Sequence, residues 1–158
     1  MEMRAMYAQC LGELMERDEK LILLDADLSK ACGTFPLRKR FPDRIYDCGV
    51  AEQNMISIAA GLASYDYKPW AESFAPFATR RVCDQIAISV CYAKRNVKIV
   101  GTDPGIAAEL NGGTICPWRT WAWSGPFRAW SSSSPRTRCS FRPPCRSCTP
   151  MRALSTCA

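Results

Sequence analysis

A carboxylate stands at the start of a predicted helix, just beyond the end of a predicted strand. Glu52 follows a strand expected at 44–48 and a turn at Gly49, and it opens a helix expected at 52–64. Parallel α/β sheets bind ligands at this end of their strands, so the carboxylate could share a proton with a bound molecule. An acid in the first turn also complements the helix dipole. Position alone leaves both interpretations open.

Two aromatic residues and a second acid could join Glu52 in a site. Phe74 and Phe77 are three residues apart and could face one ligand ring together, although ordinary core packing explains the spacing equally well. Asp27 follows the first predicted strand, where it could contact a ligand or cap the strand end. The chain contains no His.

These side chains must be positioned by strands that alternate with helices. An amphipathic helix comes first, and the helix at 52–64 presents the apolar face Met55, Ile58, Ala59 and Leu62. The alternation predicts an α/β fold with a mostly parallel sheet flanked by helices. The expected helices are 3–14, 52–64 and 78–93, and the expected strands are 21–25, 44–48, 68–71 and 96–101.

The net charge of +6 comes entirely from the end of the chain. Residues 1–114 carry 14 basic and 15 acidic side chains, whereas residues 115–158 carry seven Arg and no acid. The excess therefore does not indicate a nucleic-acid or membrane partner. We find no signal peptide and no apolar run near the roughly 20 residues of a membrane span, which predicts a reducing, cytoplasmic setting for the ten Cys.

The run at 49–63, GVAEQNMISIAAGLA, resembles the hallmark of the pyrimidine-binding domain of the transketolase family. The resemblance covers residues 3–114, and Met1 falls where the C-terminal subunit of split, two-gene transketolases begins. Deoxyxylulose-phosphate synthases and the beta subunits of 2-oxoacid dehydrogenases are related, but less similar around Glu52 and Phe74. Further segments resemble the family in the same order, at 24–30, 41–44, 72–81, 84–85, 96–101 and 111–114.

The resemblance implies thiamine diphosphate as cofactor and transfer of a two-carbon ketol unit between sugar phosphates. Glu52 is implied to hold a proton on the pyrimidine ring, Phe74 and Phe77 to stack against it, and Asp27 to lie near the cofactor and the subunit contact. No role is assigned to Arg80, at the family's third aromatic-side position. An N-terminal partner subunit is implied to bind the diphosphate with Mg²⁺ or Ca²⁺, in a dimer of such pairs. We expect no metal ligands in this chain.

Residues 115–158 differ from the rest, with Trp, Arg, Pro, Ser and Cys in excess and no helical or strand period. In the family the turn at 111–114 leads into an active-site His, but here Ile115 follows. A one-base frame shift after Thr114 explains both, because the tail through Phe141 can then be reread as H(M/L)PMEDMGMVRSIPGLVVFEPTDAVQL, which resembles the family's continuation. Resequencing the gene across Thr114 tests this hypothesis.

We therefore predict a partial, truncated pyrimidine-binding domain at 1–114 and an aberrant, irregular tail at 115–158. Cys145 and Cys148 form one C-x2-C pair, but the remaining Cys spacings fit no zinc template. The alternatives are a non-catalytic remnant, a binding-only domain and a fragment like deoxyxylulose-phosphate synthase.

Overall fold

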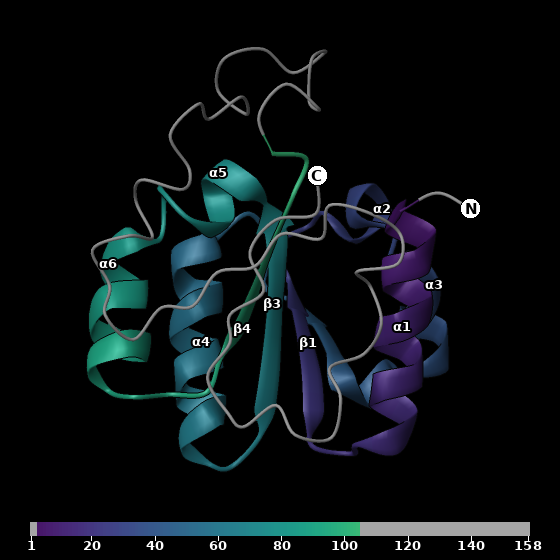
Figure 1. Cartoon of the computed structure of the whole chain (residues 1–158), viewed down its shortest axis with the longest axis horizontal. Coiled ribbons are helices and arrows are strands. Elements are labelled where there is room, and N and C mark those ends of the chain that lie inside the picture. The colour runs from purple at the N-terminus through teal and green to yellow at the C-terminus, as the bar shows by residue number, and fades with distance from the viewer. Residues whose placement is uncertain (1–2, 105–158) are drawn as a thin grey trace.

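A four-stranded sheet occupies the centre of residues 3–104, the part of the chain that the computed structural model describes (Figure 1). The strands run parallel in the order β2-β1-β3-β4. Every residue of β1 is buried, as expected for a strand covered on both faces. The predicted α/β class is confirmed. The strands are β1 (Leu21–Asp25), β2 (Ile45–Asp47), β3 (Lys68–Phe74) and β4 (Lys98–Thr102).

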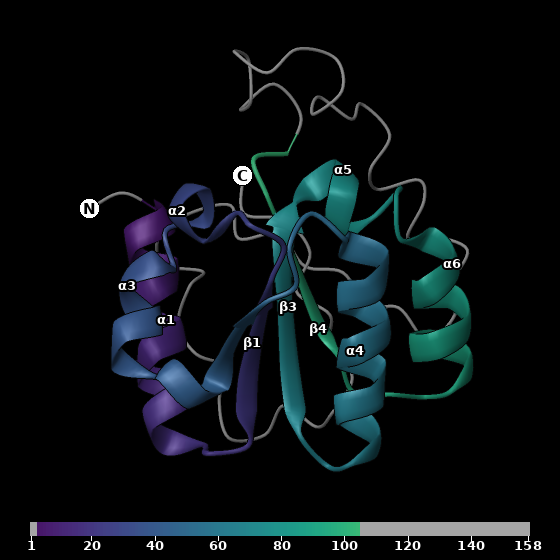
Figure 2. The same ribbon diagram turned by 180° about the vertical axis from the view of Figure 1, so that it is seen from behind.

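Helices cover both faces of this sheet, as Figures 1 and 2 show from opposite sides. Helices α1 and α3 lie on one face, α4 and α6 lie on the other, and the short α2 and α5 lie at the end where the strands finish. Residues 3–104 contain no helix long and apolar enough to cross a membrane. The elements are α1 (Met3–Arg17), α2 (Ser29–Cys32), α3 (Phe35–Arg40), η1 (Pro42–Arg44), α4 (Glu52–Ser64), α5 (Ala75–Ala78), α6 (Cys83–Gln85) and η2 (Ile86–Tyr92).

Two apolar layers, one on each face of the sheet, hold the helices in place. Ile22 and Leu24 of β1 join the layer beneath α4 and η2. Leu21 and Leu23 join the layer beneath α1 and α3. This alternation follows from the pleat, which points successive side chains of a strand to opposite faces.

Pro69 lies in β3, an interior strand, although proline cannot donate a hydrogen bond. The N–H of Lys68 donates to the carbonyl of Lys20 just before β1. Because alternate residues face opposite neighbours, the nitrogen of Pro69 faces β4, whose pairing with β3 begins only at Trp70. The sheet therefore loses no hydrogen bond at Pro69. Strand β3 also continues to Phe74, beyond the predicted end at 71.

The single helix predicted at 78–93 is wrong. Helix α5 ends at Ala78, the chain turns through residues 79–82, and helical structure resumes as α6 and the π-helical η2. The backbone leaves helical geometry at Thr79, where φ is −126° and ψ is −76°, and the Thr79 hydroxyl donates to the Ala75 carbonyl at 2.6 Å. The N–H of Arg81 donates to the Pro76 carbonyl at 3.2 Å.

Helix α4 has the predicted bounds, and Met55 and Ala59 of its predicted apolar face are buried, but the buried face includes Ile56 rather than Ile58. Ile56 is fully buried, whereas Ile58 is 39% exposed. Small residues allow close packing elsewhere on this side of the sheet: a Cβ placed on Gly101 of β4 would lie 2.8 Å from the Cα of Ala75 at the start of α5.

Candidate functional site

Glu52 opens α4 and is buried, with 2% of the residue exposed. The connection from β2 reaches it through Gly49, which has a φ of +69° that favours glycine. The N–H of Gly49 donates to a carboxylate oxygen of Asp47 at the end of β2. The strand end and the glycine turn thus place this carboxylate at the expected edge of the sheet.

Arg81 supplies the partner of the Glu52 carboxylate. Its Nη1 lies 2.9 Å from Oε1 and 2.9 Å from Oε2 of Glu52. The main-chain carbonyl of Arg81 accepts a hydrogen bond from Nε2 of Gln53 at 3.1 Å, which ties residue 81 to the first turn of α4. Since a buried carboxylate without a partner is costly, this ion pair stabilises the buried state of Glu52.

The sequence drew attention to Arg80, but its neighbour makes the contact. Arg80 is exposed, and no hydrogen bond or ion pair within residues 3–104 joins it to Glu52. The helix break at Thr79 decides which of the two arginines faces α4. Two consecutive arginines after Phe77 were the available signal, but the break could not be predicted from helical periodicity.

Phe77 lies against Arg81 of this ion pair, and Phe74 lies beside Phe77. Their ring centroids are 6.2 Å apart with the planes tilted by 46°. The guanidinium carbon of Arg81 lies 3.9 Å from the centroid of the Phe77 ring, within the range of a cation–π contact. Glu52, Arg81 and Phe77 therefore form one connected group, and Phe74 extends its aromatic side.

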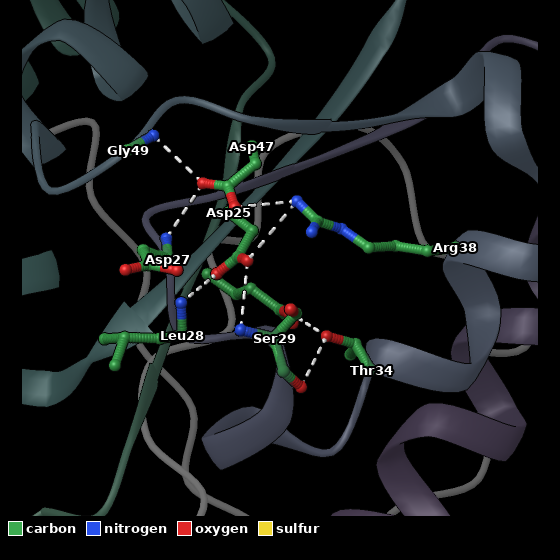
Figure 3. Close-up of polar contacts among 9 residues, drawn as sticks. Asp25, Asp27, Leu28, Ser29, Thr34, Arg38, Asp47 and Gly49 are labelled. Carbon is green, nitrogen blue, oxygen red and sulfur yellow. Dashed lines mark hydrogen bonds and ion pairs between the residues drawn. The ribbon is translucent and has the colours of Figure 1, made fainter.

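Asp27 lies on a separate, tightly held loop after β1 (Figure 3). It is exposed, with a φ of +58°. Its N–H donates to Oδ1 of Asp47 at 3.0 Å, and the same oxygen accepts the N–H of Gly49 at 2.9 Å. One carboxylate therefore joins the Asp27 loop to the connection that leads to Glu52. No hydrogen bond or ion pair within the described range joins the carboxylates of Asp27 and Glu52.

Asp25 and Arg38 complete the support of this loop. Asp25 is fully buried, and its two oxygens accept the N–H groups of Leu28 at 3.0 Å and Ser29 at 2.9 Å. Burial raises the pKa of Asp25, and these N–H donors partly oppose the rise. Arg38 lies 4.0 Å from Asp25 and 2.9 Å from Asp47. Asp25 thus provides the cap that we predicted as an alternative role of Asp27.

Residues 1–141 match the family model of the transketolase pyrimidine-binding domain. The chain belongs to this family. The match covers most of the chain and agrees with the parallel sheet and the buried Glu52 described above. Membership of the transketolase family implies thiamine diphosphate as the cofactor.

Two of the known relatives are described as a transketolase subunit and a transketolase C-terminal section. The 6-deoxy-6-sulfo-D-fructose transketolase subunit SqwH of Clostridium sp. (strain MSTE9) is 51% identical over 112 residues, which are 71% of this chain and 35% of that protein. The putative transketolase C-terminal section of Methanocaldococcus jannaschii is 46% identical over 110 residues, 70% of this chain and 35% of that protein. The chain thus spans about a third of the length of these relatives.

A solved structure described as a split gene transketolase, inactive beta4 tetramer, superposes with a TM-score of 0.79 and 31% identity. The superposition covers 97% of this chain and 50% of that chain. These findings confirm the predicted likeness to the C-terminal subunit of a split transketolase. The turn at 111–114, Ile115 and the predicted tail lie outside the described residues, so the domain boundary and the frame shift stay predictions.

The transketolase cofactor can be tested against the residues present. Glu52 already binds a flat cation through N–H groups, and the same cation lies on the Phe77 ring. A protonated aminopyrimidine is also flat, cationic and rich in N–H donors. The carboxylate and the aromatic ring therefore fit the pyrimidine half of thiamine diphosphate.

A third buried carboxylate, Glu72 of β3, was missed by the sequence reasoning. It is fully buried and accepts a hydrogen bond from the Tyr7 hydroxyl at 2.8 Å, while Trp70 Nε1 donates to Tyr7 at 3.0 Å. Thr34 Oγ1 contacts its other oxygen. Burial raises the pKa of Glu72 to about 7, although these hydroxyl contacts favour the charged form. An acid in the interior of a predicted strand segment was the available signal.

Proposed function

We propose that this chain is the pyrimidine-binding part of a thiamine-diphosphate-dependent transketolase, which moves a two-carbon ketol unit between sugar phosphates in the cytoplasm. The observation that carries the proposal is the burial of Glu52 at the start of α4, with its carboxylate bound to a flat cation that lies on the Phe77 ring. The chain's membership of the transketolase pyrimidine-binding family supports a pyrimidine ring as the group that Glu52 binds.

Glu52 acts in this proposal by holding a proton at the distal ring nitrogen of the pyrimidine. A charge-assisted hydrogen bond in a buried site is strong, so the carboxylate favours the protonated ring. Phe74 and Phe77 support one face of that ring and exclude water from it. When bound, thiamine diphosphate supplies a thiazolium carbon that becomes a nucleophile once it loses its proton.

The remaining parts of the site come from a partner in this proposal. An N-terminal transketolase subunit binds the diphosphate together with Mg²⁺ or Ca²⁺, and two such pairs form a dimer. The likeness to a transketolase C-terminal section supports this division. Asp27 lies near the cofactor and the subunit contact. The family's active-site His returns at position 115 if the gene has the proposed frame.

The proposal is tested by proton exchange at the reactive carbon of the cofactor, because this step needs no sugar and no His. The full chain is combined with an N-terminal transketolase subunit, thiamine diphosphate and Mg²⁺ in deuterium oxide. NMR then follows loss of the thiazolium proton signal. Glu52→Gln removes the acidic group with little change in shape, and Glu19→Gln alters an exposed acid as the matched control.

We expect Glu52→Gln to slow exchange by about 100-fold or more, the typical size of an acid–base contribution. Glu19→Gln should exchange at the wild-type rate. Equal rates in Glu52→Gln and wild type would overturn the role given to Glu52. Failure of the wild-type assembly to accelerate exchange above free cofactor would instead favour a binding-only domain or a remnant.

A further inference from the structure

The guanidinium of Arg81 contacts both the Glu52 carboxylate and the face of the Phe77 ring, which a bound pyrimidine ring would also contact. One of its nitrogens bridges both oxygens of Glu52 at 2.9 Å, and its carbon lies 3.9 Å from the Phe77 ring centroid. A ring that is hydrogen-bonded to Glu52 and stacked on Phe77 would occupy the same space. The two groups cannot hold both surfaces at once.

We propose that Arg81 is an internal competitor of the pyrimidine ring, pairing with Glu52 until the ring displaces it. This inference rests on the proposed function, because it takes the pyrimidine as the ligand of Glu52. Arg81 also affects the protein before any ligand binds. It neutralises a buried carboxylate before the ligand arrives, which spares the fold an uncompensated charge.

The surroundings of Arg81 allow its side chain to leave while its backbone stays. The side chain is 43% exposed, whereas the Glu52 side chain is only 3% exposed, so the arginine is the partner with access to water. Gln53 holds the main-chain carbonyl of Arg81, and the turn at 79–82 ends at the buried Val82. Displacement therefore requires rotation of one long side chain rather than movement of α4.

A fragment of the cofactor separates this competition from effects of the diphosphate charge. The probe is 4-amino-5-hydroxymethyl-2-methylpyrimidine, which carries the ring without phosphate or thiazolium. It is titrated to its solubility limit into the full chain, and Kd is measured by NMR. Arg81→Met keeps an extended apolar side chain and removes the cation, while Arg80→Met changes the exposed neighbouring arginine as the matched control.

Arg81→Met should bind the probe about fivefold more tightly than wild type, the gain expected when a partly exposed ion pair no longer competes. Arg80→Met should bind like wild type. If Arg81→Met does not fold, Arg81→Lys replaces it. Lysine keeps the charge but presents no flat group to Phe77, so its Kd should fall between those of wild type and the methionine variant.

The outcomes distinguish this inference from the proposed function. If Glu52→Gln weakens probe binding but removal of the Arg81 guanidinium leaves Kd unchanged or weakens it, Arg81 does not compete and only this inference fails. If the probe binds no variant, or binds equally with and without the Glu52 carboxylate, the pyrimidine is not the ligand of Glu52. The proposed function then fails as well.

Discussion

Replacing Glu72 by Gln should change how the stability of this domain depends on pH. Glu72 is fully buried in β3, between the hydroxyls of Tyr7 and Thr34. Its folded-state pKa is raised from 4.5 to about 7 by burial. The Tyr7 and Thr34 hydroxyls donate to the carboxylate and favour its charged form, so they oppose this rise in pKa without cancelling it.

The sign of the effect follows from the direction of this shift. Because the folded protein holds the proton more tightly than the unfolded chain, the contribution of Glu72 is fully present below pH 4.5 and is lost as the pH rises through about 7. The gap between the two pKa values corresponds to about 3 kcal/mol. To fold above pH 7, the wild type must either bury the charged Glu72 carboxylate or take up a proton, and both cost free energy. The neutral amide of Glu72→Gln has no such cost.

Urea unfolding at pH 5 and pH 8 measures this difference. The free energy of unfolding of the wild type should fall between the two pH values by up to about 3 kcal/mol more than that of Glu72→Gln. Glu19→Gln, at an exposed position, should keep the wild-type dependence. An identical fall in wild type and Glu72→Gln would refute the assignment of a raised pKa to Glu72.

Two further substitutions test how the site is supported. Asp47→Ala removes the oxygen that accepts the N–H groups of Asp27 and Gly49, and it should lower the free energy of unfolding by about 1–3 kcal/mol. Asp47→Asn keeps an acceptor oxygen and should lose less stability. Equal losses in the two variants would contradict the role of Asp47 as a shared acceptor. Gly101→Ala forces a methyl group against α5 and should cost about 1–3 kcal/mol in the same urea assay. Gly61→Ala, where the added methyl meets open space, should be neutral or stabilising, and similar values for both glycine variants would contradict the packing argument.

The sequence predicted most of the fold because its strands and main helices carry a strong local signal. The strand predicted at 21–25, an apolar run that ends in Asp25, is a fully buried interior strand, and α4 begins and ends where predicted. The short helices α2 and α3 were not predicted. Helix α2 has no capping side chain at its N-cap Leu28, and its first N–H donates to Asp25, four residues earlier. The buried face of α4 was also partly misjudged, because Ile56 and Ile58 both suit an apolar face until the neighbouring elements are placed.

The candidate site shows the same division between local and tertiary information. Glu52 was found from its place beyond a strand end, and its burial agrees with that choice. The contact between Arg81 and Glu52 depends on the helix break at Thr79, which the apolar period of the sequence does not show. Glu72 was overlooked because an acid inside a strand gains its meaning only from the hydroxyls of distant residues.

The central claim is that Glu52 keeps the distal pyrimidine nitrogen protonated, and nitrogen NMR tests it most directly. Thiamine diphosphate labelled with ¹⁵N at that nitrogen is bound to the full chain assembled with an N-terminal transketolase subunit and Mg²⁺. In the wild type the signal should have the chemical shift of a protonated ring nitrogen. In Glu52→Gln it should return to the value of the free, neutral cofactor, whereas a protonated signal that persists in this variant would contradict the claim.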